Sequence, residues 1–363
     1  MRRVYKLGLL SLLAFLPIQS CDDARDRPAP GSPAYRLVVL DSAGPSLEGG
    51  LEMIGSIDAL CSNPSGGFFL LDAASMCVRL IGEDGSISTL IRGGEGPGEL
   101  QAPQSMSVTP WGTLLVADAM KREVMSFSLD GSYEGPFMRS ARYVPAPITA
   151  RSDSTLVGAM QDLQMQEQPV ISYRIAVFGD SMTTECELLS RDWIWPDPAV
   201  YAEAPLMSYS AGPQGSIFVC GDCTVYRIDI FSDSGVLLGR IDRSDVPRVE
   251  KTPGEVEEER ASFEAWLRQD AAYAGGYEPH PFRQIVQLAG VDSLQRLWVR
   301  RLDVEDGILC DLWSGNGEHL GSASLPWDGS ANPVDCVVDA GGVYLTSAQS
   351  SDGVRVYRLA LIE

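Results

Sequence analysis

The stretch "FFLLD" at residues 68–72, followed by "CVRLIGEDG" at residues 77–85, decides the fold because the chain repeats it. The second copy is "LLVAD" at 114–118 with "EVMSFSLDG" at 123–131, which begins 46 residues further along. Each copy reads as a strand ending in Asp, a turn, a second strand and a tight Asp-Gly turn. Such a repeat predicts an array of similar structural units.

Four weaker copies follow, which makes six in all. They are "LVGAM" with "YRIAVFGDS", "IFVCG" with "YRIDIFSDSG", "LWVRR" with "CDLWSGNG", and "VYLTS" with "VRVYRLALIE". A period of about 40 to 55 residues with four short strands per copy is typical of propeller blades. The sequence therefore predicts an all-β fold over residues 35–363, a six-bladed β-propeller of four-stranded blades.

The two ends of this predicted ring complement each other. The last copy lacks an outer strand, and "YRLVVLD" at residues 35–41 precedes the first copy without a partner there. We expect this N-terminal strand to complete the last blade. That pairing would close the ring and leave no open sheet edge.

Residues 1–20 have the pattern of an export signal, with basic residues, then the apolar run "LGLLSLLAFLP", then "IQSC". The apolar run is too short to span a bilayer comfortably. The stretch resembles a bacterial lipoprotein signal, which implies cleavage before Cys21 and lipid on its thiol. Cleavage nearby by an ordinary signal peptidase is the alternative. Residues 21–34 are charged and proline-rich, so we expect a flexible tether.

The formal net charge of the chain is −21. This acidic balance disfavours nucleic-acid binding. From the export signal, we expect a protein of the cell envelope, on the periplasmic or cell-surface side, that meets the membrane only through its N-terminal lipid. We expect it to be monomeric. Its expected partner is a protein, peptide or glycan of the envelope.

A family resemblance rests on "GGEGPGELQAP" at residues 93–103, the strand after it, "GTLLVAD" and "FSLDG". Together they resemble the NHL-like repeats of bacterial six-bladed β-propeller lipoproteins, a family of uncharacterised function. "QRLWVRR" near residue 298 and "VRVYRLAL" near the C terminus extend the resemblance over residues 35–363. It is strongest over residues 66–131. It implies a fold and a location, but no reaction.

Antiparallel order within each blade places the long connections together on one face, here called the loop-decorated face. These connections are "GGEGPGELQAP", "MQDLQMQEQPVIS", "RDWIWPDPAVYAEAPL" and residues 244–283. The opposite face, here called the short-turn face, carries only tight turns. Loops that are longer than the connection requires often carry binding or catalytic residues. We therefore expect the partner to bind the loop-decorated face.

The glycine-rich loop at 93–103 lacks the lysine and hydroxyl of a phosphate loop, and no helix follows it. Its glycines and prolines are typical of a tight turn. The alternative makes Glu95 and Glu99 ligand or metal contacts at the mouth of the central channel.

The insertion at residues 244–283, between the fourth and fifth blades, contains the one predicted helix, at 252–272. Thr252 as N-cap and Glu255 three residues later form a capping box. This helix either packs on the propeller or forms a lid over the channel.

Five further residues of the loop-decorated face are candidate ligand contacts. Trp193, Trp195 and Tyr201 could stack on a sugar, and packing under the helix explains them equally well. His280 is the only histidine placed to face the channel mouth. Arg300 could bind an anion, although a salt bridge to the acidic loops is the simpler interpretation.

The sequence predicts no catalytic residue, metal ligand or cofactor. Two histidines are too few for a three-histidine zinc site, and three asparagines offer few amide oxygens for a calcium site. The main interpretation is thus a non-catalytic binding protein. The alternative is a calcium-dependent hydrolase, lactonase or lyase with its site in the central channel. The pair Cys220 and Cys223 in "CGDC" is interpreted as a local disulfide or two packed thiols rather than a redox or metal site.

Overall fold

The computed structural model describes residues 35–43, 54–195, 197–267, 277–304, 307–325, 333–347 and 355–362. The predicted export signal at 1–20, Cys21 and the tether at 21–34 lie outside the described residues. Every described strand belongs to the compact unit Pro33–Glu363. No described helix is both long enough and apolar enough to cross a membrane.

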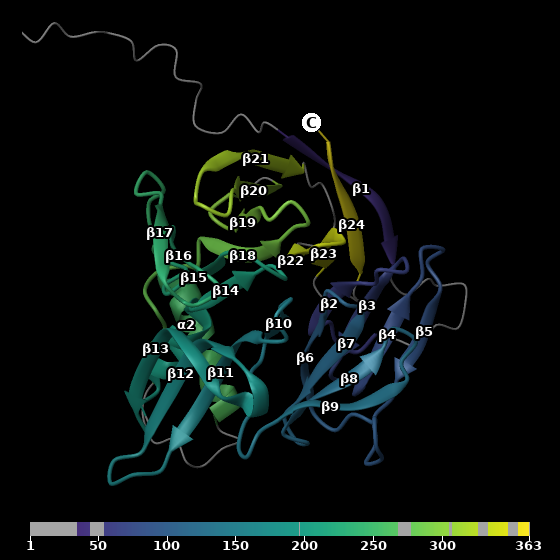
Figure 1. Cartoon of the computed structure of the whole chain (residues 1–363). Coiled ribbons are helices and arrows are strands. Elements are labelled where there is room, and N and C mark those ends of the chain that lie inside the picture. The colour runs from purple at the N-terminus through teal and green to yellow at the C-terminus, as the bar shows by residue number, and fades with distance from the viewer. Residues whose placement is uncertain are drawn as a thin grey trace, which may run out of the picture. The chain divides into compact units, whose positions relative to one another are not determined.

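Strands β2 to β17 form four separate four-stranded antiparallel sheets, and in each sheet the spatial order of the strands follows the sequence (Figure 1). This is the arrangement of a propeller blade, so the predicted all-β, propeller-like fold is confirmed. The bounds are β2 (Ala59–Ser62), β3 (Phe68–Asp72), β4 (Cys77–Ile81) and β5 (Ile87–Ile91); β6 (Pro103–Val108), β7 (Thr113–Asp118), β8 (Glu123–Ser128) and β9 (Tyr133–Arg139); β10 (Ile148–Ala150), β11 (Leu156–Gln164), β12 (Val170–Phe178) and β13 (Thr184–Ile194); β14 (Ser208–Ala211), β15 (Ile217–Cys220), β16 (Arg227–Phe231) and β17 (Leu237–Asp242).

The other eight strands form one closed sheet in the order β1, β21, β20, β19, β18, β22, β23, β24. Their bounds are β1 (Tyr35–Ala43), β18 (Val286–Val291), β19 (Leu297–Arg301), β20 (Ile308–Trp313), β21 (His319–Leu325), β22 (Pro333–Asp339), β23 (Gly342–Ser347) and β24 (Val356–Ile362). The prediction of six separate blades is therefore wrong: the structure has four blades and one closed, barrel-like sheet.

Two parallel contacts join the last two strand quartets into this closed sheet. β1 pairs with β21 at Tyr35 and Arg36, and β18 pairs with β22 through Gly290 and Val338. Gly290 has φ of 147°, and a Cβ there would lie 1.7 Å from the Val338 carbonyl oxygen. Only glycine allows this approach. A single glycine in the repeat pattern does not reveal that two neighbouring quartets will touch.

The N-terminal strand completes the last quartet as predicted. β1 runs antiparallel to β24, with Val38 opposite Ala360 and Ala43 opposite Val356. Leu37 is fully buried in the core of the closed sheet. Figure 1 shows β1 and β24 side by side, although they lie at opposite ends of the chain.

The core lies between successive sheets, which explains why β3 is buried at every position and apolar up to its final aspartate. Phe69 and Leu71 pack toward the second sheet, in a cluster with Leu114. Phe68 and Leu70 pack the other way, in a cluster with Tyr344 of the closed sheet. A strand that is buried on both faces reads as a continuous hydrophobic run rather than an alternating one.

The aspartate that ends the second strand in the strong copies is a structural residue. The Asp72 carboxylate accepts hydrogen bonds from Gly55 N at 2.9 Å and Ser75 N at 3.0 Å, and it pairs with Arg79 at 3.2 Å. It therefore ties the chain entering the first blade to the turn between β3 and β4. The equivalent Asp118 carboxylate accepts from the backbone N–H of residues 101, 102 and 121.

The predicted helix is present as α2 (Pro253–Leu267), between β17 and β18, while residues 268–276 lie outside the described residues. The predicted capping box is confirmed: Thr252 N donates to Glu255 Oε2 at 2.8 Å, and Glu255 N donates to Thr252 Oγ1 at 3.3 Å. Phe263 of α2 stacks on Tyr277 with ring centroids 3.9 Å apart. The helix is thus held at its start by hydrogen bonds and at Phe263 by aromatic packing.

Glu255 gives a prediction about acid stability. Hydrogen bonds from Arg283 and then from Thr252 lower the pKa of Glu255 from 4.5 to about 2. A carboxyl with a lowered folded-state pKa stabilises the protein above its unfolded-state pKa, and the contribution is lost as the pH falls through the folded-state pKa. We expect this loss between pH 4.5 and about 2. Denaturant titrations should show a smaller loss of stability over this range in Glu255→Gln than in the wild type or in Glu258→Gln, an exposed helix control, because other carboxyls with lowered pKa values, such as Asp72, remain. The same acid dependence in Glu255→Gln would contradict the prediction.

Candidate functional site

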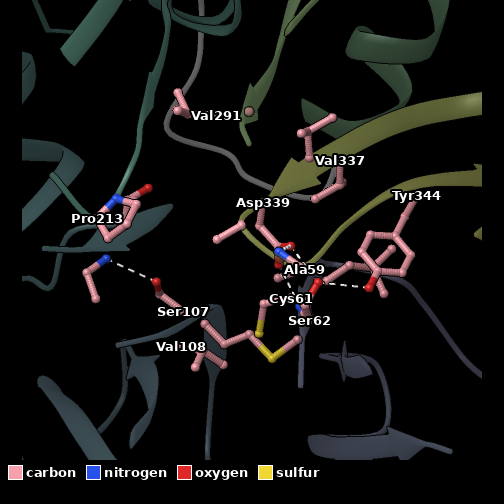
Figure 2. A pocket seen from close by; sticks show the side chains of 18 of the residues that line it. Ala59, Cys61, Ser62, Ser107, Val108, Pro213, Val291, Val337, Asp339 and Tyr344 are labelled. Atoms are coloured by element: carbon pink, nitrogen blue, oxygen red, sulfur yellow. Dashed lines mark hydrogen bonds between the residues drawn. The ribbon is translucent and has the colours of Figure 1, made fainter. Parts of the chain in front are cut away.

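A cavity of about 890 Å³ is lined by the first strands of the six repeats, β2, β6, β10, β14, β18 and β22. Turns of the short-turn face form its rim, among them residues 63–67, 212–213 and 340–341. Figure 2 shows the labelled side chains of Ser107, Val291 and Val337 around this space. The cavity therefore extends to the face opposite to the one predicted to bind the partner.

A chain of three polar side chains lies on the cavity wall where the first sheet meets the closed sheet (Figure 2). Ser62 donates from both its N and its Oγ to the Asp339 carboxylate, each at 2.5 Å. Tyr344 Oη lies 2.8 Å from Ser62 Oγ. Because Ser62 uses its proton for Asp339, Tyr344 is the donor in the second contact.

The Asp339 carboxylate is held in place by the backbone of its own turn. Gly341 N and Gly342 N donate to Oδ1 at 2.9 and 3.0 Å. Burial, together with the negative charge of Asp339, raises the pKa of Tyr344 to about 12. Tyr344 is thus a hydrogen-bond donor, not a base, at neutral pH.

Cys61 lines the same wall, beside Ser62 (Figure 2). Burial, and then the charge of Asp339, raise the pKa of the Cys61 thiol well above its ordinary value. It is therefore protonated at neutral pH and is a poor nucleophile.

Hydroxyl groups make up much of the remaining polar wall. Ile148 N donates to Ser105 Oγ at 2.9 Å and Ala150 N donates to Ser107 Oγ at 3.0 Å, which pins the third sheet to the second. Each of these serines keeps its own proton for another acceptor. The charged residues of the lining are few, namely Asp58, Glu83, Asp339 and Arg358. Such a wall suits a neutral or weakly charged molecule.

None of the seven predicted ligand contacts lines this cavity. Glu99 accepts a hydrogen bond from Gly96 N at 2.7 Å, and Lys121 Nζ donates to Gly96 O at 2.8 Å. These contacts shape the glycine-rich loop, as its turn interpretation requires. Glu95 is exposed. A ligand or metal role for the two glutamates stays a prediction.

The predicted aromatic contacts pack together beside the helix. Trp193 is buried and donates from Nε1 to Glu203 Oε2 at 3.2 Å. Trp195 and Tyr201 join the same hydrophobic cluster, and the Tyr201 ring lies 5.0 Å from that of Phe263 in α2. The packing alternative accounts for these contacts, and stacking on a sugar stays a prediction.

His280 and Arg300 occupy separate places. Phe282 N donates to His280 Nδ1 at 3.3 Å, so this ring nitrogen is engaged by the local backbone. Arg300 is buried, with Nη1 3.5 Å from Gln287 Oε1, and the Gln287 amide donates to the Asp335 carboxylate. Burial raises the pKa of Asp335, an effect that Cys336 N and Arg300 partly offset. The structure does not bring the predicted residues together into one site.

The calcium site of the alternative prediction can be tested against the residues present. Within the described ranges, no group of three or more His, Cys, Asp or Glu side chains could hold a metal ion. The cysteines of the described part are free thiols, and both members of the "CGDC" pair are buried. Hydrogen bonding to Cys220, and then burial, raise the pKa of Cys223, so this pair has the character of packed thiols.

Sequence reasoning missed Ser62, Asp339 and Tyr344. A signal was present, because Ser62 and Asp339 each end the first strand of their copies, and first strands face the axis of a propeller. These copies are the first and the last, so only ring closure makes them neighbours.

No protein-family model matches the chain, and no curated protein is similar to it. Solved structures are similar. A protein of Bacteroides fragilis described as exported has 11% identity and a TM-score of 0.50, over 91% of this chain and 95% of that one. A gluconolactonase of Xanthomonas campestris has 13% identity and a TM-score of 0.45, over 90% of each chain. A virginiamycin B lyase of Staphylococcus aureus has 14% identity and a TM-score of 0.41, over 85% and 81%. The first likeness supports a propeller fold, while lipid attachment and NHL-like repeats are not supported by these comparisons.

Proposed function

We propose that this chain is an exported β-propeller that binds a small, largely uncharged organic molecule in its central cavity. The observation that carries the proposal is the cavity of about 890 Å³ with its wall of hydroxyl, peptide and apolar groups. Small-molecule sites have volumes of roughly 300 to 1,000 Å³ and combine apolar walls with a few placed polar groups. Ser62, Tyr344 and Ser107 supply such groups from three different strands.

The location belongs to this proposal as well. The pattern of residues 1–20 supports export, and Cys21 is the residue proposed to carry lipid. Binding of an envelope protein, peptide or glycan to the loop-decorated face of a monomeric chain is a separate proposal, which rests on the length of those loops.

A second candidate function is a hydrolase or lyase acting at the same cavity. It is favoured by the Ser62 hydroxyl, which donates to a fixed carboxylate and accepts from a protonated tyrosine. In such a reaction Asp339 would accept the Ser62 proton and Tyr344 would donate to a developing oxyanion. A carboxylate is a weak base for a serine hydroxyl at neutral pH, so binding is the better supported function.

One set of variants separates the two functions. A panel of neutral sugars, lactones and amides is screened for binding by thermal shift and for turnover by product analysis. For the binding function, we expect one member of the panel to raise the melting temperature of the wild type without being turned over. This thermal shift should disappear in Thr149→Phe, because the larger side chain fills part of the cavity. For the enzymatic function, we expect turnover that falls at least about 100-fold in Ser62→Ala. Trp111→Phe, on an exposed residue outside the cavity lining, is the control. A shift that survives in Thr149→Phe would place the ligand elsewhere.

A further inference from the structure

A second pocket lies apart from the central cavity, beside the second and third sheets. It has a volume of about 580 Å³ and shares no lining residue with the central cavity. Its walls come from the turn before β8, the segment after β9, and the tip of the β11–β12 hairpin. All of these segments are described, and the proposed function makes no use of them.

Two arginines in this pocket differ from most others of the chain. Most described arginines pair with a carboxylate, as Arg240 does with Asp229 and Arg296 with Asp292. Among the described residues, no ion pair involves Arg122 or Arg142, and both line the pocket. In a chain with a net charge of −21, two guanidinium groups without a carboxylate partner in one pocket are an unusual concentration of positive charge.

The backbone around these arginines is held by hydrogen bonds. Arg122 Nη1 donates to Ala141 O at 3.3 Å, and Ser140 N donates to Arg122 O at 2.9 Å. Ser140 Oγ accepts from Arg142 N and Tyr143 N, both at 3.2 Å. The turn before β8 and the segment after β9, which carry the two arginines, are therefore tied together by hydrogen bonds.

The hairpin contributes a carboxylate to the same pocket. Asp162 Oδ1 is buried and has no hydrogen-bond partner among the described residues. Asp162 therefore brings one negative charge to a pocket that Arg122 and Arg142 also line. Leu163, Met165 and Tyr143 add apolar surface beside these charges.

We propose that this pocket binds a free amino acid or short peptide that carries both a carboxylate and a protonated amine. Guanidinium groups bind a carboxylate through paired, charge-assisted hydrogen bonds, which Arg122 and Arg142 supply. Asp162 accepts from the amine and disfavours a ligand that is only an anion, such as phosphate. The apolar lining residues contact an aliphatic side chain.

The test is calorimetric titration of the full chain with leucylleucine at neutral pH. The wild type binds it, and Arg142→Gln and Asp162→Asn each weaken binding at least tenfold. Arg92→Gln is the matched control, because Arg92 is exposed, has no ion pair among the described residues and lies outside the pocket; its affinity is unchanged. Thr149→Phe also leaves the affinity unchanged, which separates this site from the central cavity.

Three results would overturn the proposal. One is a wild-type dissociation constant weaker than about 10 mM. Another is equal binding of N-acetyl-leucine amide, which lacks both charges. The last is a pocket that binds inorganic phosphate but not leucylleucine, with phosphate binding strengthened in Asp162→Asn. The pocket would then be a simple anion site.

Discussion

Replacing Asp72 with alanine is expected to lower the free energy of unfolding by about 3 to 5 kcal/mol. The carboxylate is fully buried and holds Gly55 N, Ser56 N and Ser75 N as well as the buried Arg79 guanidinium. Without it, the buried Arg79 guanidinium loses this ion pair and three backbone donors lose their acceptor. Chemical denaturation of the wild type and the variant measures the difference.

Two comparisons show whether the ion pair causes this loss. Glu95→Ala, at an exposed glutamate, should change stability by less than about 0.5 kcal/mol. The double variant Asp72→Leu, Arg79→Met should be more stable than Asp72→Ala, because a buried pair removed as a whole leaves no unpaired charge. Asp118→Ala should cost less than Asp72→Ala, since the Asp118 carboxylate accepts its hydrogen bonds in the described part of the chain from uncharged backbone N–H groups. A loss below about 1 kcal/mol in Asp72→Ala would contradict the assigned role.

Replacing Leu37 with alanine is expected to lower the free energy of unfolding by about 2 to 5 kcal/mol. Leu37 lies on the N-terminal strand β1 but is fully buried among residues near the other end of the chain, including Leu345 and Leu359. Truncation leaves a cavity in the core of the closed sheet, at the point where the two ends of the chain are joined. Thermal and denaturant unfolding report the loss.

Val39→Ala is the matched control, because Val39 lies two residues along the same strand and is 44% exposed. We expect it to change stability by less than about 1 kcal/mol. Equal, large losses in both variants would show that β1 packs differently. Equal, small losses would show that the burial of Leu37 does not contribute to stability.

The central cavity could not be found from the sequence because its parts are far apart in the chain. Ser62 and Asp339 are separated by 277 residues, and they meet only because β1 pairs with β24 and the first sheet then lies beside the last strands. The predicted site residues were chosen for loop length and side-chain chemistry. The structure uses several of them in local packing, as with Trp193 and Glu203 or Glu99 and Gly96.

Four features could be predicted from the sequence alone: the repeated strands, the aspartate that ends the second strand, the pairing of the N-terminal strand with the last copy, and the capped helix between the fourth and fifth copies. These features depend on hydrogen bonds and hydrophobic patterns within a few residues, or on a repeat that is visible in one dimension. Three features became visible only in the folded chain: the face on which the cavity opens, the hydroxyls that surround it, and the union of the last two quartets in one closed sheet. Those outcomes depend on close approaches between distant segments, such as Gly290 against the Val338 carbonyl, which no local pattern encodes.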